Sequence, residues 1–121
     1  MIVEKSSQNG ILIVTRTTDN GSVMISNEGY ALYVVVSVDK NNVPSDGSVT
    51  VTITAEIFDY LDAPQTSDTR NITFEMGGVT DTKPAVNGVA TTTFTPGVPG
   101  TSVFTITADG CNSAQIEVIA V

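Results

Sequence analysis

An alternation of apolar and polar residues in the middle of the chain restricts what it can fold into. Between residues 49 and 57 every second residue is apolar, and threonines and one glutamate lie between them. Successive side chains of a β-strand point to opposite faces, so this segment predicts a strand with one buried face and one solvated face. Shorter alternating segments cover residues 72–76, 90–94, 104–108 and 116–120. No segment has the period of an amphipathic helix, and we therefore expect an all-β protein.

Turn-forming dipeptides separate these segments. Glycine and asparagine tolerate a positive φ, and proline fixes the first φ of a turn. Strands that recur about every 8–12 residues with such turns between them favour a β-sandwich or a β-barrel. The chain has 121 residues, the length of one domain, and 40% of them are apolar, enough for one core. The turn signals are Asp46-Gly47, Gly77-Gly78, Asn87-Gly88, Pro96-Gly97, Pro99-Gly100 and Asp109-Gly110.

Several segments match a known family in residue type and order. They are Pro44-Ser45-Asp46-Gly47 leading into residues 49–55, then Ile72-Thr73-Phe74, Asn87-Gly88-Val89-Ala90-Thr91, Gly100-Thr101-Ser102-Val103 and Ile106-Thr107-Ala108. From about residue 34 to residue 121 the chain resembles the bacterial immunoglobulin-like domains of invasin- and intimin-type adhesins, which also occur on tailed-phage virions. The resemblance implies an immunoglobulin-like β-sandwich of about seven strands. It is specific for the fold and weak for function, because one fold hosts many functions.

One link departs from the family pattern. The family usually has a short glycine-containing turn where this chain has residues 59–69, a longer link that includes Tyr60, Leu61 and Pro64. The strand that follows this link is therefore the least defined by the resemblance.

The first 29 residues lie outside the family pattern and are predicted to form a separate arm. Residues 11–16 and 23–26 flank Asp19-Asn20-Gly21, which indicates an extra β-hairpin. Residues 1–10 give no clear structural signal. We therefore divide the chain into an N-terminal arm or hairpin of residues 1–29 and a sandwich domain of residues 30–121.

The segment of residues 30–36 is apolar on both faces. A strand of this kind needs cover on both sides, and the sandwich core supplies only one of them. We expect residues 11–14 of the arm to cover the second side, with another chain as the alternative. The candidate partner contacts are accordingly Ile11, Leu12, Ile13, Val14, Tyr33 and Val35.

Residue types that carry catalysis are scarce. The chain has no histidine, one cysteine, no nucleophile elbow and no phosphate-binding loop, so we predict no catalytic residues and no enzymatic activity. No cofactor or metal site is predicted either. Cys111 is interpreted as a small, partly buried residue at the start of a strand.

Two acidic loops hold enough oxygen ligands to suggest calcium sites, and we interpret them as turns. Calcium needs six to eight converging oxygens, and neither loop has the spacing of an EF-hand. Aspartate and asparagine are also ordinary turn formers. The two loops contain Asp39, Asn41, Asn42 and Asp46, and Asp59, Asp62 and Asp68.

The charge balance disfavours two classes of partner. The formal net charge is −8, and the five basic residues are scattered, so no patch is present that would neutralise phosphates. We expect no nucleic acid and no membrane among the partners. No stretch approaches the roughly 18 apolar residues of a membrane helix.

The expected function is structural or adhesive. Because the chain begins with Met1 and has neither a secretory signal nor catalytic residues, we expect a virion surface protein of a tailed bacteriophage, a capsid or tail decoration. On this hypothesis the arm contacts capsid or tail subunits, or a second copy of the chain. The alternatives are a repeat of an adhesin on the bacterial cell surface and a carbohydrate-binding module that binds cell-surface glycans.

Overall fold

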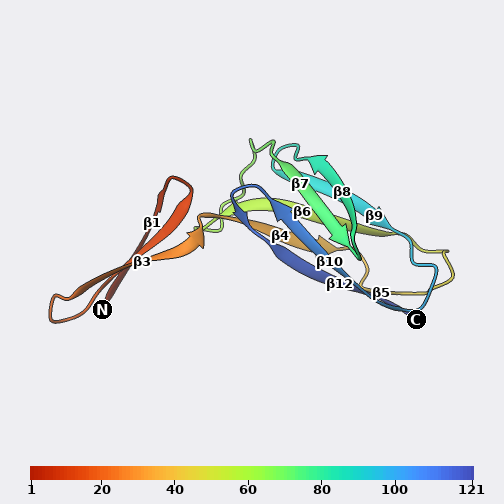
Figure 1. Ribbon diagram of the computed structural model, residues 1–121, viewed down its shortest axis with the longest axis horizontal. Coiled ribbons are helices and arrows are strands. Elements are labelled where there is room, and N and C mark those ends of the chain that lie inside the picture. Colours follow the sequence, from red (N-terminus) through yellow and green to blue (C-terminus); the bar gives the residue numbers. More distant parts are fainter.

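The computed structural model describes all 121 residues as two bodies placed end to end (Figure 1). The first is a three-stranded antiparallel sheet, which we call the N-terminal sheet, with the order β1 (Ile2–Gln8), β2 (Ile11–Thr17), β3 (Val23–Tyr30). The second is a sandwich of a five-stranded sheet, β5-β12-β10-β7-β8, and a four-stranded sheet, β11-β4-β6-β9. The predicted all-β sandwich with an additional N-terminal hairpin or arm is confirmed. The sandwich strands are β4 (Leu32–Val38), β5 (Asn42–Val43), β6 (Val51–Asp59), β7 (Asn71–Met76), β8 (Val79–Pro84), β9 (Val89–Phe94), β10 (Gly100–Ala108), β11 (Cys111–Asn112) and β12 (Ala114–Ala120).

The sandwich core is built from the inward faces of the alternating strands. In β6, Val51, Ile53, Ala55 and Ile57 have at most 1% of their surface exposed, and the residues between them point outward. Full burial of one such branched side chain contributes about 1.5–3 kcal/mol to folding. The core cluster has 14 buried residues, and none of them comes from the N-terminal sheet. The sandwich therefore has a hydrophobic core of its own.

Strand β1 was not predicted, although its turn carried a signal. It pairs with β2 over seven residues, from Ile2 opposite Thr17 to Gln8 opposite Ile11. The turn between them is Asn9-Gly10, and both residues have a positive φ, 55° and 79°. Asn-Gly is the preferred sequence for this two-residue hairpin turn. Residues 4–8 are polar and show no strand-like alternation, so composition did not predict this strand. The Asn9-Gly10 turn sequence was the signal that could have predicted it.

The long link of residues 59–69 is held by hydrogen bonds at both ends. The carboxylate of Asp59 accepts hydrogen bonds from the backbone N–H groups of Leu61 (2.8 Å) and Ala63 (2.9 Å). Further along, the N–H of Gln65 donates to the carbonyl of Ile57 at 2.9 Å. The link therefore folds back beside β6, with most of its side chains exposed.

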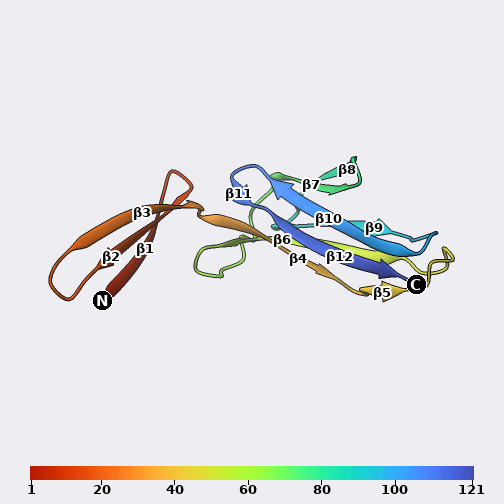
Figure 2. The same ribbon diagram turned by 60° about the horizontal axis from the view of Figure 1, so that its bottom comes forward.

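The N-terminal sheet joins the sandwich through one residue. Only Ala31, which is buried, separates β3 from β4. Asn112 of β11 makes two hydrogen bonds to Tyr30, the last residue of β3. Its side-chain amide donates to the carbonyl of Tyr30 (2.8 Å), and its side-chain oxygen accepts from the N–H of Tyr30 (3.3 Å). Both views show the sheet projecting from this end of the sandwich (Figures 1 and 2).

Candidate interaction surface

The inner face of the N-terminal sheet is covered near the junction. Leu12 and Val14 alternate on the central strand β2 with Ile11 and Ile13, so the two pairs lie on opposite faces. Leu12 and Val14 are buried in a small cluster with Ala31, and Tyr60 of the sandwich packs against it. This contact attaches the near end of the sheet to the sandwich.

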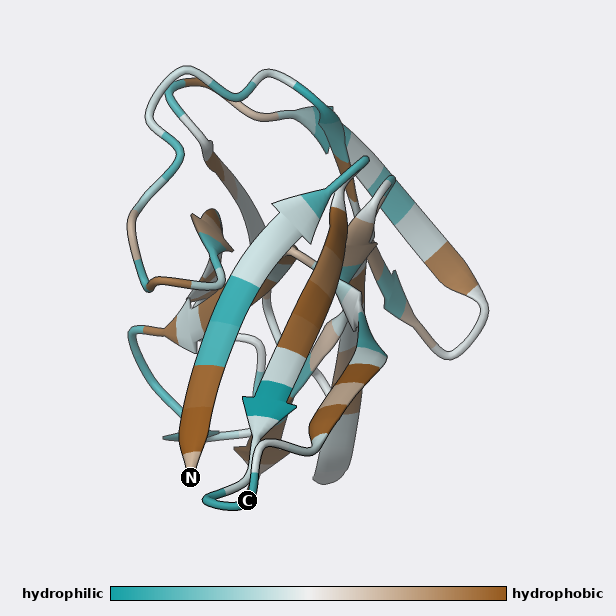
Figure 3. Ribbon diagram, turned by 90° about the vertical axis from the view of Figure 1, so that its left-hand side faces the viewer, coloured by the Kyte–Doolittle hydropathy of each residue, from teal (hydrophilic) through white to brown (hydrophobic).

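At the far end of the N-terminal sheet, the outer strands β1 and β3 expose apolar side chains on both faces, on either side of Thr15, Arg16 and Thr17 of the central strand. Val23, Met24 and Ile25 follow one another on β3, and Ile2 and Val3 do so on β1, so each pair of neighbours places side chains on opposite faces. Figure 3 shows the apolar start of β1. We call this region the tip patch; its members are between 52% and 71% exposed. They are Met1, Ile2, Val3, Val23, Met24 and Ile25.

The charges of the N-terminal sheet are few and largely paired within it. Residues 1–30 hold two basic and three acidic side chains, whereas the remaining 91 residues hold three basic and ten acidic ones. Arg16 donates to Glu28 (3.2 Å) and to Ser26 (3.1 Å). The hydrogen bond from Arg16 keeps the pKa of Glu28 below its usual value. The N-terminal ammonium pairs with Asp19 at 2.7 Å. The sheet is thus nearly neutral, and the sandwich carries the acidic charge.

The six residues expected to form one partner contact occupy separate surfaces. Ile11 and Ile13 are half-buried on the outer face of the N-terminal sheet, while Leu12 and Val14 are buried at the junction. Tyr33 and Val35 lie on the outer face of β4, where Val35 is 47% exposed.

The expectation that the arm covers Val35 is therefore wrong. Leu12 and Val14 already pack against Ala31 and Tyr60, and the single-residue link leaves the sheet projecting away from β4. Sequence reasoning also missed the tip patch. The run Val23-Met24-Ile25, apolar on both faces of a strand, was the signal that could have found it.

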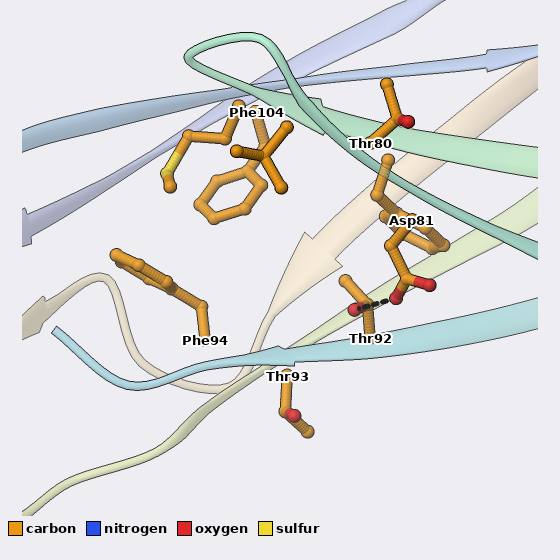
Figure 4. A pocket seen from close by; sticks show the side chains of 9 residues that line it. Thr80, Asp81, Thr92, Thr93, Phe94 and Phe104 are labelled. Carbon is orange, nitrogen blue, oxygen red and sulfur yellow. Dashed lines mark hydrogen bonds between the residues drawn. The ribbon is translucent and has the colours of Figure 1, made fainter.

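A cavity of about 200 Å³ lies in the sandwich between the edge strands β8 and β9 (Figure 4). Its apolar walls include Phe94 and Phe104, whose rings meet edge to face with centroids 5.2 Å apart. Asp81 of β8 accepts a hydrogen bond of 2.7 Å from the hydroxyl of Thr92 on β9. This bond satisfies Thr92, a buried polar residue, and links the two sheets across their open side.

Cys111 belongs to a structural tie around Arg70. It is buried at the start of β11, which confirms its interpretation as a partly buried strand-start residue. Arg70 donates to the Asp68 carboxylate (2.9 Å), to the Asp109 carbonyl (2.5 Å) and to the Cys111 sulfur (3.3 Å). Burial raises the pKa of the Cys111 thiol despite the opposing charge of Arg70. The protonated thiol is a poor nucleophile.

At Asp68 the interaction with Arg70 outweighs the effect of burial on the pKa, the opposite of the result at Cys111. Burial favours a higher pKa for this carboxyl, yet the hydrogen bonds and charge of Arg70 outweigh it and hold the pKa below its usual value. The tie therefore contains an ionised carboxylate that connects the start of β7 to the turn between β10 and β11.

In the acidic loops, several carboxylates accept hydrogen bonds from backbone N–H groups. Asp39 accepts a hydrogen bond from the N–H of Thr52 (2.8 Å), and Asp46 accepts one from the N–H of Ser48 (3.0 Å). Asp59 caps its own loop in the same way. No three residues among the aspartates, glutamates and the cysteine converge as metal ligands.

Comparisons with known proteins identify the fold. No family model and no curated protein matches the sequence. A glycosyl hydrolase family 2 member from Bacteroides cellulosilyticus matches with a TM-score of 0.68 and 16% identity, over 94% of this chain and 18% of that one. A β-glucuronidase from Parabacteroides merdae matches with a TM-score of 0.61 and 17% identity, over 93% of this chain and 17% of that one. The D00-D0 domain of intimin matches with a TM-score of 0.64 and 16% identity, over 94% of this chain and 66% of that one.

The sandwich is immunoglobulin-like. This chain spans less than a fifth of the two hydrolases and about two-thirds of the intimin fragment, so the likeness concerns only a part of each of those proteins. Because the matches cover 93–94% of this chain, they include most of the N-terminal sheet as well as the sandwich. The structure has no helix that could cross a membrane.

Proposed function

We propose that this chain is a non-enzymatic structural domain that attaches through its N-terminal sheet to a larger protein assembly and holds the immunoglobulin-like sandwich outward. The observation that carries the proposal is the tip patch, which is apolar on both faces of a sheet that projects beyond the sandwich. Exposed apolar side chains gathered at one end of a sheet mark a candidate site of protein interaction.

The two-sided exposure favours a partner with a cleft. A flat surface would cover Ile2, Val23 and Ile25 on one face and leave Val3 and Met24 on the other in water. A cleft covers both faces at once. The near-neutral charge of the sheet adds little repulsion of its own at an acidic partner, whereas the sandwich would meet such a partner with most of the chain's negative charge.

The setting that we propose is the surface of a virion, where capsid or tail subunits supply the cleft. The likeness to the intimin fragment supports a second setting, the bacterial cell surface, in which the domain is one module of an adhesin. In both settings the N-terminal sheet is the attachment site and the sandwich is the projecting part.

The test compares variants that differ only in the tip patch. Val23→Ser combined with Ile25→Ser removes two exposed apolar side chains, and Val86→Ser combined with Val98→Ser, in sandwich loops, is the matched control with similar exposure. We expect the tip variant to lose co-sedimentation with purified virions, or with cell envelopes, of the source organism. The control variant retains it.

A second variant without residues 1–29 should fold and fail to bind, because the sandwich core contains no residue of the N-terminal sheet. Circular dichroism checks the folding. Binding of the truncated chain at the level of the full chain contradicts the proposal, and binding to virions but not to envelopes, or the reverse, identifies the setting.

A further inference from the structure

The edge strands of the two bodies differ in how they are protected. An edge exposes unpaired backbone groups, and proteins usually blunt it with short strands, charged side chains, prolines or bulges. Edge strands β5 and β11 have two residues each, and β3 has a bulge and Glu28. Strand β1 carries Glu4 and Lys5, and β8 carries Asp81, Lys83 and Pro84. Strand β9, with the sequence Val-Ala-Thr-Thr-Thr-Phe, has none of these devices.

The free backbone groups of β9 can be assigned from its hydrogen bonds. The carbonyl of Gly88 accepts from the N–H of Ile57 on β6 (2.9 Å), whereas on the opposite side the N–H of Val89 donates to Val86 (3.1 Å) and its C=O accepts from Val86 (2.8 Å). In an antiparallel ladder the bonding direction alternates from one residue to the next. The N–H and C=O groups of Thr91 and Thr93 therefore point outward from the sheet, where β9 has no neighbouring strand.

The open part of this edge lies beside the cavity. At the start of β9, the N–H of Gly88 donates to the carbonyl of Asp68 (3.0 Å), so the long link covers that end. At the other end, Thr92, Thr93 and Phe94 line the cavity between β8 and β9. An added strand would thus pair along residues 91–95 and place an inward side chain over the mouth of the cavity.

We propose that the open edge of β9 pairs with β9 of a second copy of this chain, antiparallel, about a two-fold axis at Thr93. Thr93 of the two copies then forms a hydrogen-bonded pair, and Thr91 of each copy lies opposite Thr95 of the other, giving about six backbone hydrogen bonds. Phe94 of each copy lies opposite Thr92 of the other, over the cavity mouth. This pairing joins the four-stranded sheets of the two copies into one continuous sheet.

A second copy can approach at this edge because β9 itself carries no charged side chain. Each chain carries a net charge of −8, so two copies meet only where like charges are not brought opposite one another. Pairing about Thr93 places uncharged threonines opposite each other, and such cross-strand threonine pairs are favourable. The repulsion between the remaining surfaces predicts a weak dimer that tightens when salt screens them.

Sedimentation equilibrium of the full chain tests this pairing. The average mass should rise with concentration toward twice that of the monomer, and the dissociation constant should fall when NaCl is raised from about 50 mM to about 500 mM, because screening lengths shorten. Thr93→Asp places two carboxylates opposite each other and should raise the dissociation constant about tenfold or more. Thr107→Asp, the same change at an exposed position of the central strand β10, should leave it within about twofold.

A disulfide trap reports the geometry directly. In a Cys111→Ala background, Thr93→Cys should form a disulfide-linked dimer under mild oxidation, because paired residues of adjacent strands lie within disulfide range. Thr107→Cys should form no disulfide-linked dimer. Equal cross-linking at both positions, or a monomer at all concentrations and salt levels, overturns the proposal.

The truncated chain separates this dimer from attachment through the tip patch. Removal of residues 1–29 should leave dimerisation unchanged. A dimer that needs residues 1–29 and survives Thr93→Asp contradicts pairing through β9, whatever the result of the attachment experiment.

Discussion

Gly88→Ala tests how the long link is held against the sandwich. A Cβ at this position would lie 2.2 Å from the backbone oxygen of Gln65, and the φ of Gly88 is +79°. Gly47 has nearly the same φ, +78°, and nothing within 4 Å of the position that its Cβ would occupy. Gly47→Ala therefore isolates the cost of the backbone conformation, and the difference between the two variants isolates the clash.

The magnitude follows from two contributions. An alanine in the left-handed region costs about 1–2 kcal/mol, and both variants share this cost. To admit the new Cβ, Gln65 must withdraw by about 1 Å, because real Cβ contacts are not shorter than 3.0 Å. The withdrawal disrupts the hydrogen bonds from Gln65 to Ile57 and from Gly88 to Asp68, each with a net contribution of about 0.5–1.5 kcal/mol.

We expect Gly88→Ala to lower the free energy of unfolding by about 2–5 kcal/mol and Gly47→Ala by about 1–2 kcal/mol. The assay is urea denaturation followed by circular dichroism, with linear extrapolation to water. A difference between the two variants below about 0.5 kcal/mol would refute the reasoning, since it would mean that the link yields without losing its hydrogen bonds.

Three further predictions concern the core and the Arg70 tie. The lowered pKa of Asp68 stabilises the fold above the pKa of the unfolded chain, and this stabilisation is lost as the pH falls through the folded pKa; urea denaturation should therefore show the wild-type advantage over Asp68→Asn shrinking below about pH 4. Ile106→Ala should lower the free energy of unfolding by about 2–5 kcal/mol, and Val103→Ala, half-exposed on the same strand, by less than about 1 kcal/mol. A thiol reagent should label Cys111 much more slowly in the folded protein than in urea, because the sulfur is buried and its pKa is raised; equal rates would contradict its placement.

The sequence predicted the strands whose alternation records burial and missed the two edge strands that are exposed throughout, β1 and β8. In β6 one face is buried in the core, so its residues must alternate, and the prediction matched the structure. Strands β1 and β8 are exposed along their whole length, so no face restricts their composition. Backbone pairing with β2 and β7 alone makes them strands.

The candidate surface was only partly predictable for a related reason. Apolar character on both faces was visible at residues 11–14 and 30–36, but the sequence does not say which apolar face meets which. In the structure Leu12 and Val14 pack against Ala31 and Tyr60. Tyr60 belongs to the link that follows β6, far from residues 11–14 in the sequence. The openness of β9 depends on the order of strands in the sheet, which pattern alone does not determine.

The single-residue link at Ala31 has a mechanical consequence. The N-terminus and the C-terminus lie toward opposite ends of the long axis (Figure 1). Tension applied between the N-terminal sheet and the end of β12 passes without slack from β3 into β4, because Asn112 clamps Tyr30 and no flexible linker intervenes. Strand β4 is paired with β6 over seven residues, from Leu32 opposite Asp59 to Val38 opposite Ile53. A pull along β4 loads these pairs together in shear, so we expect the domain to resist extension as one stiff unit.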